Sequence, residues 1–144
     1  MTLLCNHTFS TAETATVSPN NITCHDGDPR SAVIQAAFTY GSGGTTLKAW
    51  VQTSLDYGTT WSDVYCFSVT QTSVINIVNL SALTAVTTPY VPTDGTLTAN
   101  TTKDGILGPM FRVKTTSTGT YAANTTLRID MYFPGVLDAR VAAA

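Results

Sequence analysis

Residues 44–69, GTTLKAWVQTSLDYGTTWSDVYCFSV, indicate two β-strands joined by a turn, and this stretch decides the fold class. In a strand, alternate side chains point to the same face. The run before the turn places three apolar side chains on one face: Leu47, Ala49 and Val51. The run after it places a second set on one face, with Asp63 as a polar exception: Trp61, Tyr65, Phe67 and Val69. The stretch predicts a β protein.

The turn itself matches the S-x-D-x-G-x-T-W pattern of the Asp-box, which is best known from sialidase-like propellers. The matching residues are Ser54, Asp56, Gly58, Thr60 and Trp61. In such a turn a hydroxyl or carboxylate accepts hydrogen bonds from the loop amides, glycine adopts the left-handed conformation, and tryptophan packs beneath. A sialidase would also need several blades and an arginine cluster, and the chain has one match and scattered arginines. We therefore predict a structural role for this turn.

Alternation recurs along the rest of the chain. It is clear over residues 34–40 and strongest over 126–133, where apolar and polar side chains take opposite faces. Weaker strands are predicted near residues 12–19, 74–80, 82–87 and 110–116. With turn residues between the runs, this spacing predicts an all-β fold, an antiparallel β-sandwich of about eight strands.

Length and composition restrict the function. The chain has 144 residues and 15.2 kDa, which fits a single domain over 1–144. Charged residues make up 11%, the net charge is −2 and no Lys/Arg cluster occurs, so we expect no nucleic-acid partner. No apolar run is long enough to span a membrane, and no signal peptide is recognisable. Three cysteines without regular spacing indicate reduced thiols in a protein made in the cytoplasm.

Both ends carry apolar residues outside the clear strand patterns, and we predict extended arms over 1–11 and 134–144. Such arms dock either on the chain's own sandwich or on a partner, and the sequence leaves both alternatives open. The irregular segment 88–109 is long enough to cross between sheets or to make a contact. The predicted partner contacts from these three segments are Leu3, Leu4, Phe9, Tyr90, Val91, Leu137 and Val141.

Metal and catalytic sites are not expected. Cys5, His7, Cys24 and His25 have ligand chemistry for zinc, but their spacing is wrong for a zinc site. A calcium loop starting at Asp26 lacks the glutamate at its twelfth position. No pair of carboxylates and no nucleophile motif has a catalytic arrangement, so we predict no enzyme activity and no cofactor.

The segments 43–61, 111–114 and 127–130 resemble small virion proteins of tailed bacteriophages, most closely the capsid cement (decoration) proteins with a jelly-roll fold. The resemblance spans residues 31–133. It implies a jelly-roll sandwich on the capsid surface of the virion, made in the bacterial host cytoplasm, with the major capsid protein as partner. It brings no catalytic residues. A homo-dimer is favoured over a trimer.

An alternative is a glycan- or receptor-binding β-sandwich of a tail or fibre appendage. Exposed aromatic rings stack on sugars, and the candidates for a stacking surface are Trp50, Tyr57 and Tyr65. The same residue types are enriched in protein interfaces. A second layer packed over Trp50 would explain that residue without a ligand.

Overall fold

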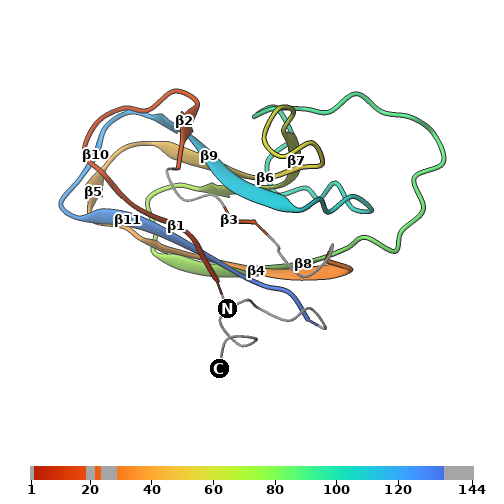
Figure 1. Ribbon diagram of the computed structural model, residues 1–144. Coiled ribbons are helices and arrows are strands. Elements are labelled where there is room, and N and C mark those ends of the chain that lie inside the picture. Colours follow the sequence, from red (N-terminus) through yellow and green to blue (C-terminus); the bar gives the residue numbers. More distant parts are fainter. Residues whose placement is uncertain (1, 19–21, 24–28, 135–144) are drawn as a thin grey trace.

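The structure is a computed structural model that describes residues 2–18, 22–23 and 29–134, and it is an antiparallel β-sandwich (Figure 1). The first sheet has the order β1-β11-β4-β8, and the second has the order β2-β9-β6-β7 with β3 also paired to β9. A short ribbon of β5 and β10 lies at one end. The strands are β1 Thr2–Phe9, β2 Thr16–Val17, β3 Ile22–Thr23, β4 Ser31–Thr39, β5 Ser42–Gly43, β6 Thr46–Ser54, β7 Ser62–Val69, β8 Val74–Ser81, β9 Met110–Thr118, β10 Tyr121–Ala122 and β11 Thr125–Tyr132.

The strand pairing is that of a jelly roll. Strand β1 pairs with β11, β2 and β3 pair with β9, β4 pairs with β8, and β6 pairs with β7, all antiparallel. The chain is therefore doubled into one long ribbon whose tip is the β6–β7 turn, and this ribbon is rolled into two facing sheets. The predicted all-β sandwich of jelly-roll type is confirmed.

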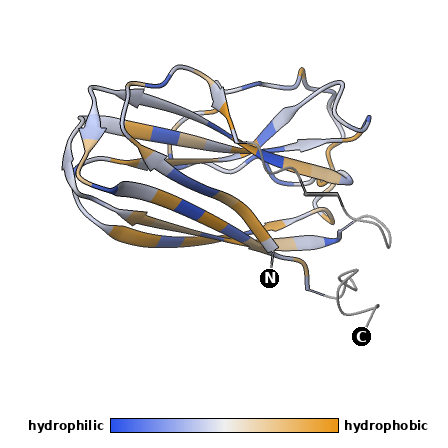
Figure 2. Cartoon of the chain, turned by 60° about the vertical axis from the view of Figure 1, so that its left-hand side comes forward, coloured by the Kyte–Doolittle hydropathy of each residue, from blue (hydrophilic) through white to orange (hydrophobic). Residues whose placement is uncertain are grey.

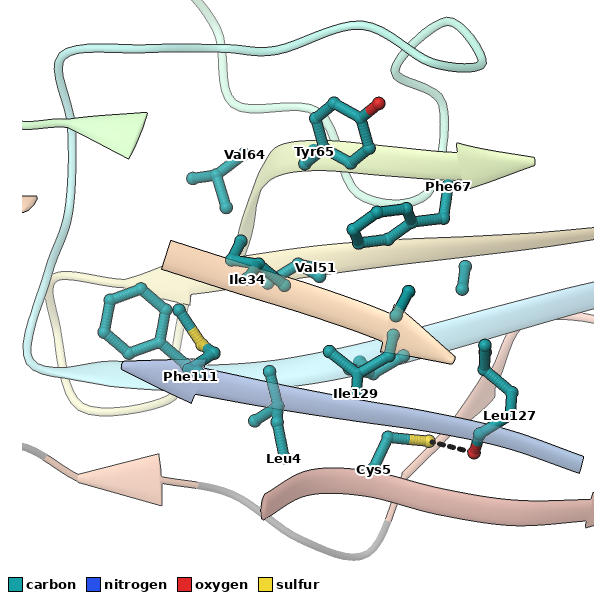
Figure 3. Packing of buried hydrophobic residues seen from close by; sticks show 14 of the residues in the cluster. Leu4, Cys5, Ile34, Val51, Val64, Tyr65, Phe67, Phe111, Leu127 and Ile129 are labelled. Carbon is teal, nitrogen blue, oxygen red and sulfur yellow. Dashed lines mark hydrogen bonds between the residues drawn. The ribbon is translucent and has the colours of Figure 1, made fainter. Parts of the chain in front are cut away.

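The core lies between the two sheets (Figure 3). Alternation places every second side chain inside, for example Ile34 on β4 and Val51 on β6, neither of which is exposed. Phe111 of the second sheet packs against Phe133 after β11, with ring centroids 5.2 Å apart. Hydrophilic and hydrophobic residues alternate along several of the strands (Figure 2).

The N-terminal prediction is corrected by β1. Residues 1–11 were expected to form an extended arm, but residues 2–9 pair with β11 at the edge of the first sheet. A register shift between Leu3 and Cys5 turns Leu4 and Cys5 inward together, which breaks the alternation that would have marked a strand. Leu4 and Phe9 are 0% and 1% exposed, so they are core residues and not partner contacts. Of the two alternatives left open by the sequence, residues 2–9 therefore dock on the chain's own sandwich.

Two further differences from the sequence prediction concern weak strands. Residues 82–87 were expected to be a strand, but they form a turn and an irregular segment after β8. Of the strand expected near 12–19, only β2 forms within its described residues. The predicted C-terminal arm begins at Pro134, and its contacts Leu137 and Val141 lie outside the described residues. In the described ranges no helix is long and apolar enough to cross a membrane.

Candidate protein-binding surface

The Asp-box turn is built as the sequence predicts, from hydrogen bonds within the turn. Gly58 N donates to Ser54 Oγ at 2.8 Å, and Thr60 N donates to Asp56 Oδ1 at 2.7 Å. The bond from the Thr60 amide lowers the pKa of Asp56, which stays ionised at neutral pH. Trp61 Nε1 donates to the Gly58 carbonyl at 3.1 Å. The turn is closed at the tip of the ribbon by its own hydrogen bonds.

Gly58 offers a test of this geometry, because its φ of +97° is strained for any other residue, while a Cβ there would meet no atom closer than 3.8 Å. We expect Gly58→Ala to lower the free energy of unfolding by about 1 kcal/mol through backbone strain alone. Gly105→Ala is the matched control: φ is +98°, but a Cβ there would lie 2.7 Å from the Thr84 carbonyl oxygen. Urea denaturation should show a larger loss for Gly105→Ala, and equal losses would contradict the geometry.

Asp63 anchors the long loop 82–109 to the outer face of the second sheet. Its carboxylate is fully buried and accepts hydrogen bonds from the amides of Gly95, Thr96 and Leu97 at 2.9 to 3.1 Å. Gln52 Nε2 donates to the same carboxylate at 2.8 Å. A register shift in the β6–β7 pairing separates Asp63 from the inward side chains that follow it on β7. The polar exception in the sequence is thus a loop anchor.

Three charged side chains, Asp94, Arg112 and Lys114, lie next to this anchor at the surface. Lys114 Nζ lies 2.5 Å from Asp94 Oδ1, and Arg112 Nη2 lies 3.4 Å from the same oxygen. Burial raises the pKa of Asp94, but the hydrogen bonds from Lys114 and Gln52 outweigh it, so the net pKa is lowered. The Arg112 guanidinium also lies 4.2 Å over the Trp61 ring. These contacts join the loop, the sheet and the Asp-box turn.

The loop also covers the rings proposed as a sugar-stacking surface. Trp50 is buried, and its Nε1 donates to the Leu97 carbonyl at 3.0 Å. Tyr65 is buried and packs against Phe67, with ring centroids 4.5 Å apart (Figure 3). Of the three candidate rings only Tyr57 is exposed. Stacking on a glycan needs an open ring face, so Trp50 and Tyr65 do not supply one in this structure.

No group of three or more His, Cys, Asp and Glu side chains in the described ranges is arranged to hold a metal ion. Cys24 and His25 lie outside those ranges. Cys5 is buried, and burial raises the pKa of its thiol to about 11. His7 Nε2 instead contacts Glu13 Oε1, and Thr115 Oγ1 donates to Glu13 Oε2 at 2.7 Å. These contacts tie β1 and the segment after it to β9.

The two ends of the sandwich differ in character. At one end, which we call the turn end, short segments rich in Gly, Ser and Thr connect the strands, namely 41–45, 70–73 and 118–120. At the other, the loop end, lie the Asp-box turn and the loop 82–109, on the right of Figure 1. Register places the end of β6 beside the start of β9, and the start of β4 beside the end of β8.

Several exposed apolar side chains lie in the Asp-box turn and in the loop 82–109, the two segments of the loop end. Val91 is 85% exposed and Leu83 is 75% exposed. The exposed apolar residues of the Asp-box turn and the loop are Leu55, Tyr57, Leu83, Val86 and Val91. The three turn-end segments contribute no large exposed apolar residue. An uneven distribution of this kind marks an interaction surface more strongly than scattered single residues do.

The predicted contact residues divide into three groups. Leu3 is 37% exposed at the start of β1, and Val91 is open to solvent. Tyr90 is partly buried, with its hydroxyl 3.5 Å from Ser62 Oγ and Lys103 Nζ 4.0 Å from its ring centroid. Leu4 and Phe9 are buried in the core. Leu55 and Leu83 were not predicted as contacts, because Leu55 stands inside the Asp-box pattern and Leu83 inside a segment predicted to be a strand.

The outer face of the first sheet is a second open surface. Arg128 and Asp130 of β11 form a two-pronged ion pair there, with Nε–Oδ2 and Nη2–Oδ1 distances of 2.9 and 3.2 Å. Tyr132 is half exposed on the same strand. On β8, Ile75 and Ile77 are 64% and 62% exposed. Register sets these two isoleucines beside Ala37 and Gln35 of β4, on the outward side.

No protein-family model matches the chain, and no curated protein and no solved structure matches it.

Proposed function

We propose that this chain is a non-enzymatic virion structural protein, a cement protein that decorates the capsid of a tailed bacteriophage. The loop end would contact the major capsid protein on the outer surface of the particle. The observation that carries the proposal is the collection of exposed apolar side chains on this end. Apolar side chains surrounded by polar ones are typical of a surface that another protein covers.

The loop that presents these side chains is fixed in advance, which supports a binding role. Asp63 holds residues 95–97 through their amides, and the 100–103 segment pairs with the edge of β7. A loop held in place loses less conformational entropy when it binds. A cement protein repeats one modest contact at many equivalent capsid positions, so a small preorganised surface is sufficient to stabilise the shell.

The described carboxylates are also consistent with a structural protein. Asp104 accepts from the Ser81 amide at 2.6 Å and from Thr84 Oγ1 at 2.9 Å, which fixes the start of the loop. Asp56 closes its turn, Asp63 anchors the loop, and Asp130 pairs with Arg128. Each of these groups has a bond that holds the fold together.

We expect the double substitution Leu83→Asp/Val91→Asp to weaken binding to depleted capsids of the encoding phage at least about 100-fold. Burying each of these side chains contributes about 1.5 to 3 kcal/mol, and a buried unpaired charge opposes binding further. The measurement is co-sedimentation of the purified chain with capsids over a concentration series. Circular dichroism should be unchanged, because both side chains are exposed.

The matched control is Thr72→Asp/Thr120→Asp, which adds the same charge at exposed positions of the turn end. It should bind like the parent chain. Equal loss in both variants would show a general charge effect, and no loss in either would reject the loop end as the contact. Absence of the chain from purified particles, together with glycan binding that Tyr57→Ala abolishes, would favour the appendage alternative.

A further inference from the structure

Strand β8 has a palindromic sequence. Residues 74–78 read Val-Ile-Asn-Ile-Val in either direction, with Asn76 at the centre. Val74 and Val78 point toward the core, opposite Phe38 and Ile34 of β4. Ile75 and Ile77 point outward and are among the most exposed apolar residues of the chain. An antiparallel pair of two such strands, centred on Asn76, places each residue opposite one of its own kind.

The same strand is the edge of the first sheet, and its free side is open. Strand β8 pairs with β4 over eight positions without a register shift. In the described part of the chain, residues 74–80 make no backbone hydrogen bond to any segment other than β4. The strand also contains no proline and no charged residue. Long, flat, uncharged edges of this kind pair readily with another strand.

The other long edges are protected, which makes β8 stand out. The edge of β7 is covered by the long loop, with hydrogen bonds from Cys66 N to Thr101 O and from Asn100 N to Cys66 O. The edge of β1 is bent by the register shift beside Leu4. Natural sheets use such coverings and bulges to prevent unwanted pairing. The fold protects two edges and leaves the third open.

We propose that β8 pairs antiparallel with β8 of a second copy of this chain, about a twofold axis at Asn76. Ile75 then lies opposite Ile77 of the partner subunit, and Val74 lies opposite Val78 of the partner subunit. The two Asn76 side chains meet on the axis, where each amide has a donor and an acceptor for the other. The two first sheets become one continuous sheet across the dimer.

A second copy is the occupant that the sequence favours. A foreign strand could use the open backbone, but it would not require a palindrome. A palindrome suits an isologous interface, because each residue then meets one of its own kind in both directions. The absence of charge on the strand also removes the repulsion that would arise when like charges face each other. The inference does not depend on the capsid role.

The test uses two pairs of charges in the proposed register. In Ile75→Glu/Ile77→Glu, each glutamate faces a glutamate of the other copy. We therefore expect the dissociation constant of the dimer to rise at least about 100-fold above that of the parent chain. In Ile75→Lys/Ile77→Glu, each lysine faces a glutamate, and the dimer should return. All the substituted side chains are exposed in the monomer, so both variants should fold alike. Sedimentation equilibrium measures the mass of each chain at concentrations from about 1 to 100 μM, a range that covers dimers with micromolar dissociation constants.

The parent chain should sediment at twice its 15.2 kDa mass. A monomer throughout this range would overturn the proposal, as would a Glu/Glu variant that stays dimeric. If the Lys/Glu variant is also monomeric, the antiparallel register is wrong. Asn76→Cys gives a second readout, because it should form an intersubunit disulfide across the axis. Asn79→Cys should not, since Ser73 of the partner subunit would face it. Neither result bears on capsid binding, which is measured separately.

Discussion

Phe9→Ala is expected to lower the free energy of unfolding by about 4 kcal/mol, one of the largest effects of any single substitution in this chain. Phe9 is 1% exposed at the end of β1 and packs on Tyr121, with ring centroids 6.3 Å apart. Removing the ring leaves a cavity between the first sheet and the β5–β10 end. Leu4→Ala should cost about 3 kcal/mol for the same reason. Urea denaturation followed by far-ultraviolet circular dichroism measures both losses.

Leu3→Ala is the matched control, since Leu3 neighbours Leu4 but points outward. We expect a change within about 0.5 kcal/mol. Similar small effects for all three substitutions would mean that residues 2–9 are a detachable arm and that the pairing of β1 with β11 is wrong. With the pairing as described, deletion of residues 1–8 removes a strand and exposes the core. Such a deletion would report on folding and not on partner binding.

Asp63→Ala is expected to lower the free energy of unfolding by about 3 kcal/mol or more. The substitution leaves the amides of Gly95, Thr96 and Leu97 without their buried acceptor, while Gln52 Nε2 keeps its bond to Asp94. Each buried donor left unpaired costs about 1 to 3 kcal/mol, reduced where the loop moves to reach water. Hydrogen exchange should accelerate at the three loop amides and much less in β4, so the loss is local as well as global.

Asp94→Ala provides the contrast, because the Asp94 carboxylate is half exposed whereas Asp63 is fully buried. Screening by solvent limits the expected loss to about 1 kcal/mol or less. If Asp94→Ala cost as much as Asp63→Ala, the loop would be held by the surface charges and not by the buried anchor. The loop-end surface would then be sensitive to salt concentration.

The fold was predictable wherever alternation was unbroken. Strand β4 shows a clean period of two, apolar residues alternate in the sequences of β6 and β11, and the turn after β6 carries its own signature at Ser54 and Asp56. Strand β1 was missed because a bulge places Leu4 and Cys5 on the same side, which no alternation template allows. The strand expected over 82–87 was wrong for the opposite reason. Apolar residues occur there, but this segment does not pair with any described strand.

The candidate site was less predictable, because it depends on which face each strand turns outward. Val91 was named from the length of its segment, and it is exposed. Ile75 and Ile77 lie in a strand that was predicted, but a period of two does not say which of its two faces meets the core. The role of Asp63 required the register shift in the β6–β7 pair, which is set by tertiary packing and has no local signal.

The nested pairing of the ribbon also determines the order in which the chain can fold. The β6–β7 hairpin joins residues close in sequence, whereas Thr2 must find Met131 to close the last pair. Loop closure is entropically cheapest for the hairpin, so pairing starts at the Asp-box turn and extends toward the two termini. Strand β1 precedes its partner β11 in the sequence, so it is synthesised before β11 exists to pair with it. The apolar side chains Leu4 and Phe9 therefore stay uncovered in the nascent chain until β11 has been made, and exposed apolar strands of this kind are prone to aggregation.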